Sequence, residues 1–486
     1  MNKFIGRHLE LEQLNAALQS SKAEMIAVIG RRRVGKTYLI QHALGHRIVF
    51  EVTGVQNATR KQQLINFSYA LRLSGAGREN APKDWMEAFF WLTELLQAKA
   101  LAEKPVIFLD ELPWLATHRS GFLQALSWFW NSWAVKRKIV LVICGSAASW
   151  MINKVVNHKG GLHNRLTRRI NLKPFQLFET QEFLSDRRLH YSPSQIVELY
   201  MVTGGIPLYL NQVRPGISVA QNIDQMCFSD GGLLKDEFNN LFAALFTGAE
   251  KHISIIRALA NHHYGLTRKQ LINKLPSLQG RALTQVLKEL VISGFVTELR
   301  KFGNDKASKH YRLTDEYSLF YIKFIEPRPI AIPGVWLNLS QTQGYSVWSG
   351  YAFENVVIKH IPQIKQALGI SGVYSETSTY MVAKKEDKPG VQIDLILDRK
   401  DRTISLCEIK FSQDQIRFSK EDELKIRQKI SAFKMHTNTR KSIILTVISP
   451  FGILKNQYSL SVVGQSIKAN DVLFQEPINF QPLVSW

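Results

Sequence analysis

Residues 30–37 read Gly30-Arg31-Arg32-Arg33-Val34-Gly35-Lys36-Thr37 and decide the fold of the first part of the chain. They have the spacing G-x-x-x-x-G-K-[ST] of a phosphate-binding loop (P-loop). An apolar strand is predicted before the loop, at residues 25–29, and a helix after it, from Tyr38. A strand, a glycine turn and a helix N-terminus aim backbone N–H groups at one point, where a phosphate can lie. We therefore predict that residues 30–38 bind a nucleotide, with Lys36 on the β- and γ-phosphates and the Thr37 hydroxyl on Mg²⁺; a plain glycine turn is the alternative.

Two further apolar runs end in polar side chains that can act on the same nucleotide. Residues 105–109 are a predicted buried strand followed by Asp110 and Glu111, and residues 139–145 are another, followed by Ser146. Carboxylates at the end of a parallel strand beside a P-loop can bind Mg²⁺ and activate water. We assign Asp110 to the metal and Glu111 to the attacking water. Ser146 either helps to position that water or caps the helix that follows.

Three arginines, Arg165, Arg168 and Arg169, precede a strand-like run at residues 170–172. An arginine in this place could reach the phosphates of a neighbouring subunit as an arginine finger. A basic surface that faces DNA or solvent is the alternative, and the sequence does not choose among the three.

The composition indicates a globular chain that attracts polyanions. Its 486 residues favour about three or four domains, and a hydrophobic content of 45% supplies material for cores. The formal net charge is +22. DNA is the expected partner, because neutralisation of phosphates supplies most non-specific affinity. A generally basic proteome is the alternative explanation of the charge.

Cysteine usage and the N-terminus point to the cytoplasm. Cys144, Cys227 and Cys407 are far apart and form no C-x-x-C pair, so we expect neither a zinc site nor disulfides. The first residues have no secretory signal, and no run of about 18 apolar residues predicts a membrane span.

The opening residues Phe4-Ile5-Gly6-Arg7-His8-Leu9-Glu10-Leu11 resemble the start of AAA+-related ATPases of the STAND and archaeal-ATPase group. Members of that group also carry a G-R-R-R-x-G-K-T loop, a strand ending in D-E and a G-x-P motif, here Gly205-Ile206-Pro207. The resemblance covers residues 1–330. It implies that Ile5, Gly6 and Pro207 flank the adenine, and it is the only basis for expecting a hexamer; a dimer or monomer stays open.

The middle of the chain predicts a helical lid and a winged helix. Residues 175–244 have helical apolar spacing, and a lid in such ATPases reports the nucleotide state. Residues 245–326 predict three helices and a hairpin with a turn at residues 303–305, an order that resembles a winged helix. Arg281, Gln285 and Lys288 lie at helical spacing in the third helix and could face DNA. A packing or dimerising role is the alternative.

The C-terminal part predicts a second catalytic site built from carboxylates. Glu354 lies in a predicted helix, Asp394 in a strand at residues 391–397, and Glu408 and Lys410 on one face of a strand at residues 404–410. Carboxylates inside apolar strands are costly unless they are paired or bind a cation. Three converging acids favour Mg²⁺, and a lysine can stabilise the transition state. A salt-bridged hairpin core is the alternative.

This order of residues resembles the PD-(D/E)xK nuclease superfamily, although Ile393 replaces the nominal proline. The resemblance implies that Asp394 and Glu408 bind Mg²⁺ or Mn²⁺, that Lys410 is the catalytic lysine and that Glu354 is the upstream helix acid. Gln428 is either an extra polar site residue or a surface residue. The whole order also resembles bacterial and archaeal proteins that join an ATPase to a DUF234 domain.

The sequence therefore predicts an α/β protein. Its expected parts are a P-loop AAA+-like ATPase core (1–174), a helical lid (175–244), a winged-helix domain (245–326), a linker (327–345) and a restriction-endonuclease-like α/β domain (346–486). The leading hypothesis is an ATP-hydrolysing protein coupled to a metal-dependent DNA nuclease, and the pairing suggests defence against foreign DNA. A nucleotide-driven switch with a silent nuclease domain and a DNA-binding regulator are the rivals.

Overall fold

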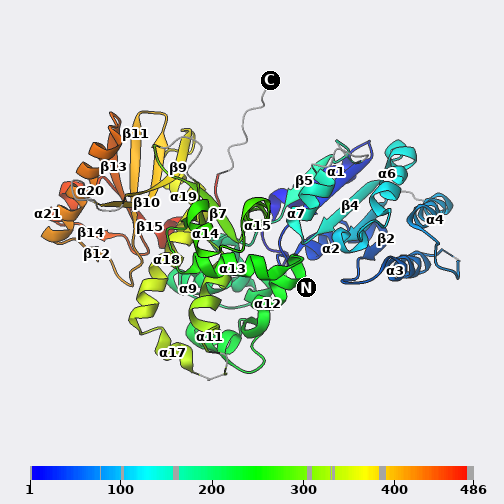
Figure 1. Ribbon diagram of the computed structural model, residues 1–486, viewed down its shortest axis with the longest axis horizontal. Coiled ribbons are helices and arrows are strands. Elements are labelled where there is room, and N and C mark those ends of the chain that lie inside the picture. Colours follow the sequence, from blue (N-terminus) through cyan, green and yellow to red (C-terminus); the bar gives the residue numbers. More distant parts are fainter. Residues whose placement is uncertain are drawn as a thin grey trace. The chain divides into compact units, whose positions relative to one another are not determined.

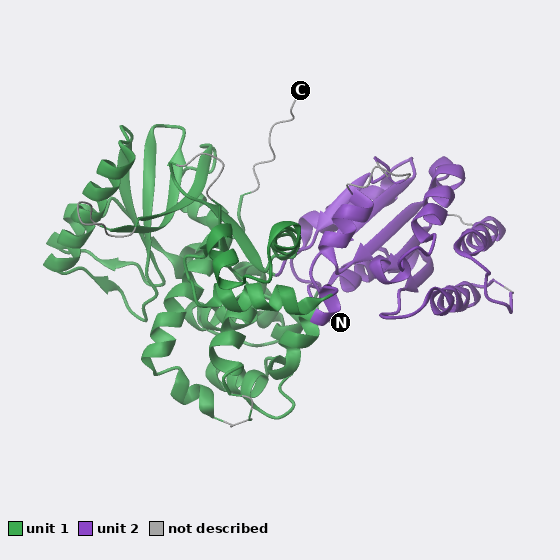
Figure 2. Cartoon of the chain, viewed as in Figure 1, with its two compact units in different colours: residues 1–3, 175–242, 248–486 green, residues 4–174, 243–247 purple. Residues whose placement is uncertain are grey.

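The computed structural model describes residues 3–76, 78–99, 103–156, 162, 164–303, 309–328, 330, 334–382 and 390–478. They form two compact units, coloured separately in Figure 2. Unit 2 comprises residues 4–174 and 243–247, and unit 1 comprises residues 1–3, 175–242 and 248–486. Within the described ranges, no helix is both long and apolar enough to cross a membrane.

Unit 2 is built on a five-stranded parallel sheet in the order β2-β3-β4-β1-β5 (Figure 1). The strands are β1 (Glu24–Ile29), β2 (Ile48–Thr53), β3 (Val106–Asp110), β4 (Val140–Gly145) and β5 (Arg168–Asn171). Every residue of β1, β3 and β4 is buried, which agrees with their nearly continuous apolar runs. Because the strands are parallel, the loops after β1, β3 and β4 leave the same edge of the sheet.

The helices of unit 2 follow the capping signals of the sequence. Thr59 caps α3 with a capping box, and Asp84 caps α4 by accepting a hydrogen bond from the Glu87 N–H. Between these helices and α6, the rings of Phe67, Trp85 and Phe122 pack edge to face. The helices are α1 (His8–Gln19), α2 (Lys36–Leu44), α3 (Arg60–Leu73), α4 (Trp85–Ala98), α5 (Leu112–Leu115), α6 (Phe122–Ser132) and α7 (Ala148–Met151).

Unit 1 begins with a helical segment that corresponds to the expected lid. Its helices are α8 (Leu177–Asp186), α9 (Pro193–Thr203), α10 (Pro207–Leu210), α11 (Val219–Phe228) and α12 (Leu233–Leu245). The glycine pair of the G-x-P segment ends α9, with Gly204 at φ +61° and Gly205 at φ +68°. The N–H of Phe175 donates to the Gly205 carbonyl over 2.8 Å, so this turn lies directly against the start of unit 1.

Three helices and a small sheet follow, as the sequence predicts. The helices are α13 (Ala249–Ala260), α14 (Arg268–Lys274) and α15 (Gly280–Ile292), and Thr267 caps α14 with a capping box. The sheet has the order β6-β8-β7, with β6 (Leu266–Thr267), β7 (Val296–Arg300) and β8 (Lys309–Leu313). Of the expected turn between β7 and β8, Asn304 and Asp305 lie outside the described residues. We call residues 249–313 the hairpin module.

The expected linker at residues 327–345 is wrong in its described part. It contains α17 (Val335–Leu339), and α18 (Gln343–Lys359) already begins within it. The buried Asp224 carboxylate accepts hydrogen bonds from the Gly334 and Trp336 N–H groups, and the Trp336 ring stacks on Phe228. The proline- and glycine-rich composition misled the prediction, because these contacts, which fix the segment, come from α11, about 110 residues away.

The C-terminal part of unit 1 is a mixed sheet in the order β15-β13-β11-β10-β9 (Figure 1). Strand β10 is antiparallel to both of its neighbours, β9 and β11, whereas β11, β13 and β15 run parallel to one another. The elements are α16 (Glu316–Phe320), α19 (Ile361–Ala367), β9 (Ser375–Val382), β10 (Val391–Arg399), β11 (Thr403–Ile409), α20 (Lys420–Thr437), β13 (Ser442–Ser449), α21 (Gln457–Val462), β15 (Gln465–Lys468) and α22 (Ala469–Val472). A separate pair joins β12 (Ile416–Arg417) to β14 (Ile453–Leu454).

Gly205→Ala should destabilise unit 1 much more than Gly216→Ala. Both glycines have positive φ, which costs an L-residue about 1–2 kcal/mol. A Cβ at Gly205 would lie 2.2 Å from the Phe175 carbonyl oxygen, whereas one at Gly216 would meet nothing within 4 Å. The crowding adds about 1–3 kcal/mol at Gly205 alone. Denaturant midpoints measure the difference, and equal midpoints for the two variants would contradict it.

Candidate functional site

The loop that joins β1 to α2 has the backbone geometry of a P-loop cradle. Gly35 and Arg33 have φ values of +89° and +73°, so the chain turns tightly before α2 begins at Lys36. Gly30 passes close to β5, and a Cβ on it would lie 2.4 Å from the Leu172 carbonyl oxygen. Only glycine fits at this position, so the loop is held against the sheet edge where phosphates are expected.

The structure brings together the residues that the sequence assigns to phosphate and Mg²⁺. The Thr37 hydroxyl donates to Asp110 Oδ2 over 2.8 Å, which connects the P-loop helix to the end of β3. The buried Lys36 amine donates to the Arg31 carbonyl oxygen over 3.1 Å. A hydroxyl and a carboxylate side by side are the oxygen ligands that Mg²⁺ prefers, so the donor set fits this ion.

Glu111 and Ser146 also lie together, at the ends of the neighbouring strands β3 and β4. Glu111 Oε2 accepts hydrogen bonds from the Ser146 N–H (3.0 Å) and hydroxyl (2.8 Å), and Glu111 has a φ of +45°. Helix α7 begins only at Ala148, and its N-cap Ala147 has no side-chain cap. The structure therefore places Ser146 against Glu111 and puts Ala147 at the N-cap of α7, while the part of Ser146 in positioning the water stays a prediction.

The remaining predicted nucleotide contacts are divided between the units. In unit 2, Ile5 and Arg31 are buried, Gly6 has a φ of +62°, and the exposed Tyr38 ring stacks on Phe4 at 5.6 Å. Arg32 and Arg33 are partly exposed, and Val34 is buried. Pro207 starts α10 in unit 1, so its expected place beside the adenine stays a prediction.

One residue that sequence reasoning missed is Arg7. It is buried, has a φ of +62°, and its Nη2 donates to the Val34 carbonyl oxygen over 3.4 Å. The opening segment thus supports the P-loop through its arginine. Among the arginines considered as fingers, Arg168 lies 3.6 Å from Glu24 of its own sheet, while Arg165 and Arg169 are exposed.

In unit 1 the three predicted nuclease carboxylates approach one another. Glu354 on α18 and Asp394 on β10 are buried, and Glu408 is the residue before the end of β11. Asp394 lies where the pairing of β10 with β9 shifts register, a bulge that re-aims the side chain. Its Oδ2 accepts the Ile409 N–H over 3.1 Å. Burial, together with the charges of Glu354 and Glu408, raises the pKa of Asp394 to about 8.

The cations beside these acids differ from the predicted one. Glu408 pairs with Lys429 of α20 at 2.6 Å, and Glu354 pairs with Arg312 of β8 at 2.9 Å. The Lys410 amine instead lies over the Phe418 ring, 5.6 Å from its centroid. Lys429 and Arg312 were not predicted, because neither is close in sequence to the E-x-K pattern. Lys429 does, however, directly follow Gln428, a candidate site residue that the structure shows to be exposed.

No complete metal cluster is formed by the described side chains. Among them, no group of three or more Asp, Glu, His or Cys is arranged to hold a metal ion. The two carboxylates of Asp394 and Glu408 remain as candidate ligands. Mg²⁺ is commonly bound by one or two carboxylates with waters and substrate phosphates, so this pair fits the ion without a third acid.

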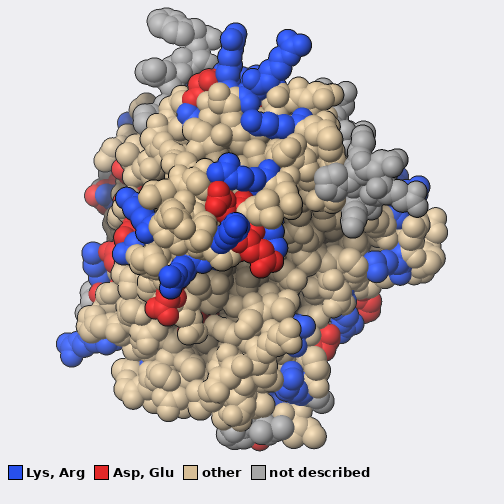
Figure 3. All heavy atoms as spheres, turned by 90° about the vertical axis from the view of Figure 1, so that its left-hand side faces the viewer, with Lys and Arg blue, Asp and Glu red and all other residues tan. Residues whose placement is uncertain are grey.

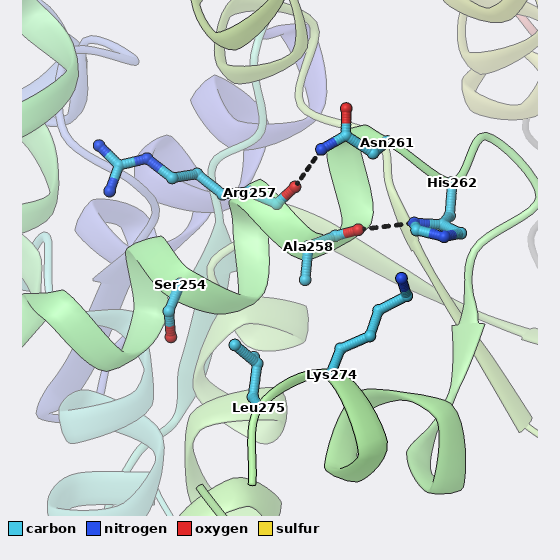
Figure 4. A pocket seen from close by; sticks show the side chains of 7 residues that line it. All are labelled: Ser254, Arg257, Ala258, Asn261, His262, Lys274 and Leu275. Atoms are coloured by element: carbon cyan, nitrogen blue, oxygen red, sulfur yellow. Dashed lines mark hydrogen bonds between the residues drawn. The ribbon is translucent and has the colours of Figure 1, made fainter. Parts of the chain in front are cut away.

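Two surface hollows in unit 1 are each lined by two basic side chains. One, of about 610 Å³, is lined by Arg417, Phe418, Ser419, Lys420, Asn456, Gln457 and Tyr458, and through Phe418 it adjoins Lys410. The other, of about 530 Å³, lies between α13 and α14 (Figure 4). There Asn261 and His262 bond to carbonyls of their own helix, and Arg257 pairs with Glu326. Of these two hollows, the first is the one that adjoins Lys410, through Phe418.

Basic side chains are spread over the surface and have acidic neighbours. Figure 3 shows the side of the chain with α20 and α21, where Asp and Glu lie among Lys and Arg. On α20, Lys425 pairs with Glu421 and Arg427 with Glu423. On α15, the predicted DNA-facing residues Arg281, Gln285 and Lys288 are all exposed, and Gln285 donates to Glu289.

Comparison with known proteins bears on the first part of the chain. Residues 4–213 match the family described as an ATPase domain predominantly from Archaea. An uncharacterized protein of Methanocaldococcus jannaschii is 26% identical over 415 residues, which cover 84% of this chain and 87% of that protein. The Walker-type ATPase PABY2304 of Pyrococcus abyssi is similar over 66% of this chain and 96% of its own, with 17% identity and a TM-score of 0.47. The Aeropyrum pernix ORC2 protein, in ADPNP–ADP complexes, covers 67% and 93%, with 16% identity and a TM-score of 0.42.

The family match spans the P-loop, the D-E strand end and the G-I-P segment. The parallel sheet and the contact between Thr37 and Asp110 belong to the same residues. The chain therefore contains a P-loop ATPase domain within residues 4–213.

Glu111→Gln should separate ATP hydrolysis from ATP binding. The amide keeps the shape of the side chain but cannot take a proton from water, so we expect kcat to fall about 100-fold or more. Affinity for ATP should be retained, since Lys36 and Thr37 are untouched. Glu51→Gln, on the neighbouring strand β2, is the control and should leave kcat unchanged. Phosphate release and nucleotide titration measure the two effects, and hydrolysis at the wild-type rate would contradict the assignment.

Asp394 should make the stability of unit 1 fall as the pH rises. Its folded pKa of about 8 exceeds the unfolded value of about 3.9, so between these values the folded state holds a proton that the unfolded state has released. Without divalent cations, the free energy of unfolding should decrease from about pH 4 to about pH 8. Asp394→Asn should flatten this decrease, whereas Asp398→Asn on the same strand should not. Urea titrations at several pH values provide the measurement, and parallel pH profiles would contradict it.

Proposed function

We propose that this chain couples ATP hydrolysis to metal-dependent cleavage of DNA. The observation that carries the nuclease part is the approach of Glu354, Asp394 and Glu408, from a helix and two strands, at one place in the C-terminal sheet. Burying three acids together is costly, and folds keep such clusters where a cation or a proton is used. In this proposal residues 175–244 are the lid, the hairpin module is a winged helix, and residues 346–486 are the nuclease-like domain.

In the ATPase site each chemical task has a residue in place. The P-loop backbone and Lys36 would bind the phosphates, and Thr37 and Asp110 would hold Mg²⁺, which neutralises phosphate charge when bound. Glu111 would take a proton from the attacking water. Ser146 now holds the Glu111 carboxylate through two hydrogen bonds, so it would set the direction in which that base points.

In the nuclease site the acids would bind the metal ion and a lysine would stabilise the phosphate. Asp394 and Glu408 would hold Mg²⁺ or Mn²⁺, which activates water and shields the phosphate when bound. Lys410 or Lys429 would stabilise the negative charge that develops on the phosphate oxygens. Lys429 has the direct contact with Glu408, whereas Lys410 lies toward Phe418 and the basic hollow.

DNA is the proposed substrate because of charge near the carboxylates. The hollow with Arg417 and Lys420 adjoins Lys410, and phosphates of a nucleic acid would be attracted to it. The overall charge of +22 and the exposed face of α15 with Arg281 and Lys288 support the same substrate class. Assembly of several copies through the ATPase domain is part of this proposal.

A nucleotide-driven switch with a silent nuclease domain is the second candidate. The observation in its favour is that Lys429 and Arg312 already neutralise Glu408 and Glu354, while no described cluster of three donors holds a metal. Such a protein would change its oligomeric state with ATP or ADP and cut nothing. Light scattering with each nucleotide therefore accompanies the cleavage assay.

Cleavage of plasmid and linear DNA with Mg²⁺ or Mn²⁺, with and without ATP, tests the proposal. We expect Asp394→Asn to abolish cleavage, and Lys36→Ala to lower it if hydrolysis drives cutting. Lys410→Ala and Lys429→Ala identify the working lysine, because only its loss should reduce kcat about 100-fold or more. Lys425→Ala, on the exposed side of α20, is the matched control for Lys429→Ala and should cut normally. Cutting by Asp394→Asn at the wild-type rate would overturn the site, and no cutting by the wild-type chain would leave the switch.

A further inference from the structure

The candidate nuclease site receives a buried side chain from outside the C-terminal sheet. Arg312 lies on β8, the middle strand of the hairpin module, and only 2% of its surface is exposed. Its Nη2 lies 2.9 Å from Glu354 Oε2. Glu354 is itself 7% exposed, so this guanidinium is the charge that faces it at close range.

The guanidinium is held along one face of α18. Its Nε donates to Asn355 Oδ1 over 2.7 Å, and its Nη2 also donates to the Tyr351 carbonyl oxygen over 3.4 Å. Asn355 in turn donates to the Leu313 carbonyl oxygen over 3.0 Å. Strand β8 and helix α18 are thus joined by a two-way set of hydrogen bonds, centred on the residue next to Glu354.

A second part of the hairpin module approaches the same helix. The His263 ring, in the turn between α13 and β6, stacks on Tyr351 with ring centroids 3.9 Å apart and 7° between the planes. Burial and the charges of Asp394 and Glu354 raise the pKa of the adjacent Tyr264. Two separate segments of the module therefore lie beside the carboxylates.

We propose that Arg312 is a positioning residue of the candidate nuclease site, which is therefore completed by the hairpin module. The proposal rests on the proposed nuclease function. A buried carboxylate without a partner takes up a proton or turns away, because ionisation in an apolar surround is unfavourable. Through the 2.9 Å contact, Arg312 fixes the position of the Glu354 carboxylate on α18. Since a guanidinium is a planar fork, it can bind Glu354, Asn355 and the Tyr351 carbonyl together, and a lysine cannot.

This geometry has a consequence for control of the site. A shift of β8 relative to α18 would remove the charge that Glu354 needs and leave the sheet carboxylates unchanged. The hairpin module would then act on cutting through one ion pair, without blocking access of DNA.

Arg312→Lys and Arg312→Ala in the full chain test the proposal, with Lys309→Ala on the same strand as the matched control. Lys309 is exposed and pairs with Glu298, away from α18. We expect Arg312→Ala to lower kcat for DNA cleavage about 100-fold, with KM for DNA unchanged, because a misplaced group costs chemistry rather than binding. Arg312→Lys should keep an intermediate kcat, and Lys309→Ala should match the wild-type chain. Methylguanidine in solution should restore cutting by Arg312→Ala and have no effect on Glu354→Gln.

The role of Arg312 and the nuclease function can fail separately in these experiments. ATP hydrolysis at the wild-type rate and an unchanged circular dichroism spectrum show that a variant is folded, and Arg312→Lys serves if Arg312→Ala does not fold. A wild-type chain that cuts DNA while folded Arg312 variants cut with the same kcat would overturn the inference alone. A change in KM without a change in kcat would also overturn it, since that marks a binding role. A wild-type chain that cuts no DNA would overturn the nuclease proposal and the inference with it.

Discussion

The ATPase domain depends on bringing the P-loop helix next to the end of β3, and the hydrogen bond between Thr37 and Asp110 makes this connection. It joins the first turn of α2 to the end of β3, although β4 lies between β1 and β3 in the sheet. The contact is possible because three parallel strands end at one edge, so that residues more than 70 positions apart meet. Gly30 adds the second requirement, since the loop passes so close to Leu172 that no side chain fits. Phosphate binding and the packing of β5 against β1 therefore depend on the same glycine.

The cost of buried charge organises unit 1 in a comparable way. Glu354 lies within α18, Asp394 at the bulge of β10, and Glu408 next to the last residue of β11, and each has a partner from a different part of the chain. Arg312 comes from the hairpin module, Lys429 from α20, and the Ile409 N–H from the strand end itself. A second ion pair, of the buried Glu316 with the partly exposed Lys359, connects α16 to the end of α18. Helix α18, which carries Glu354, is thus bound by ion pairs to two segments outside the C-terminal sheet. Its position therefore depends on both β8 and α16.

Much of the local structure could be predicted from the sequence, because the signals are local. The P-loop strand and helix, the D-E strand end, the capping box at Thr267 and the strand with Asp394 all lie within a few residues of their predicted places. The prediction of a linker was wrong because the contacts that hold this segment come from Asp224 and Phe228 on α11. The local composition does not reveal such distant contacts. Lys429 and Arg312 were not predicted as partners of the carboxylates for the same reason. A cation can serve a carboxylate from any element that packs beside it, so sequence spacing identifies the acids better than their partners.

The discontinuity of the two units bears on how the chain is made and folded. Unit 2 groups residues 243–247, which include the end of α12, with residues 4–174, and the helices between them lie in unit 1. During synthesis at about 5–20 residues per second, the sheet with the P-loop emerges well before the segment that completes its unit. The C-terminal sheet of unit 1 cannot form until β13 and β15 have been synthesised, because β11 pairs in parallel with β13, more than 30 residues later. Closing such distant contacts is slow. A nascent chain would therefore hold the parts of its ATP site long before the carboxylates of the second site could meet.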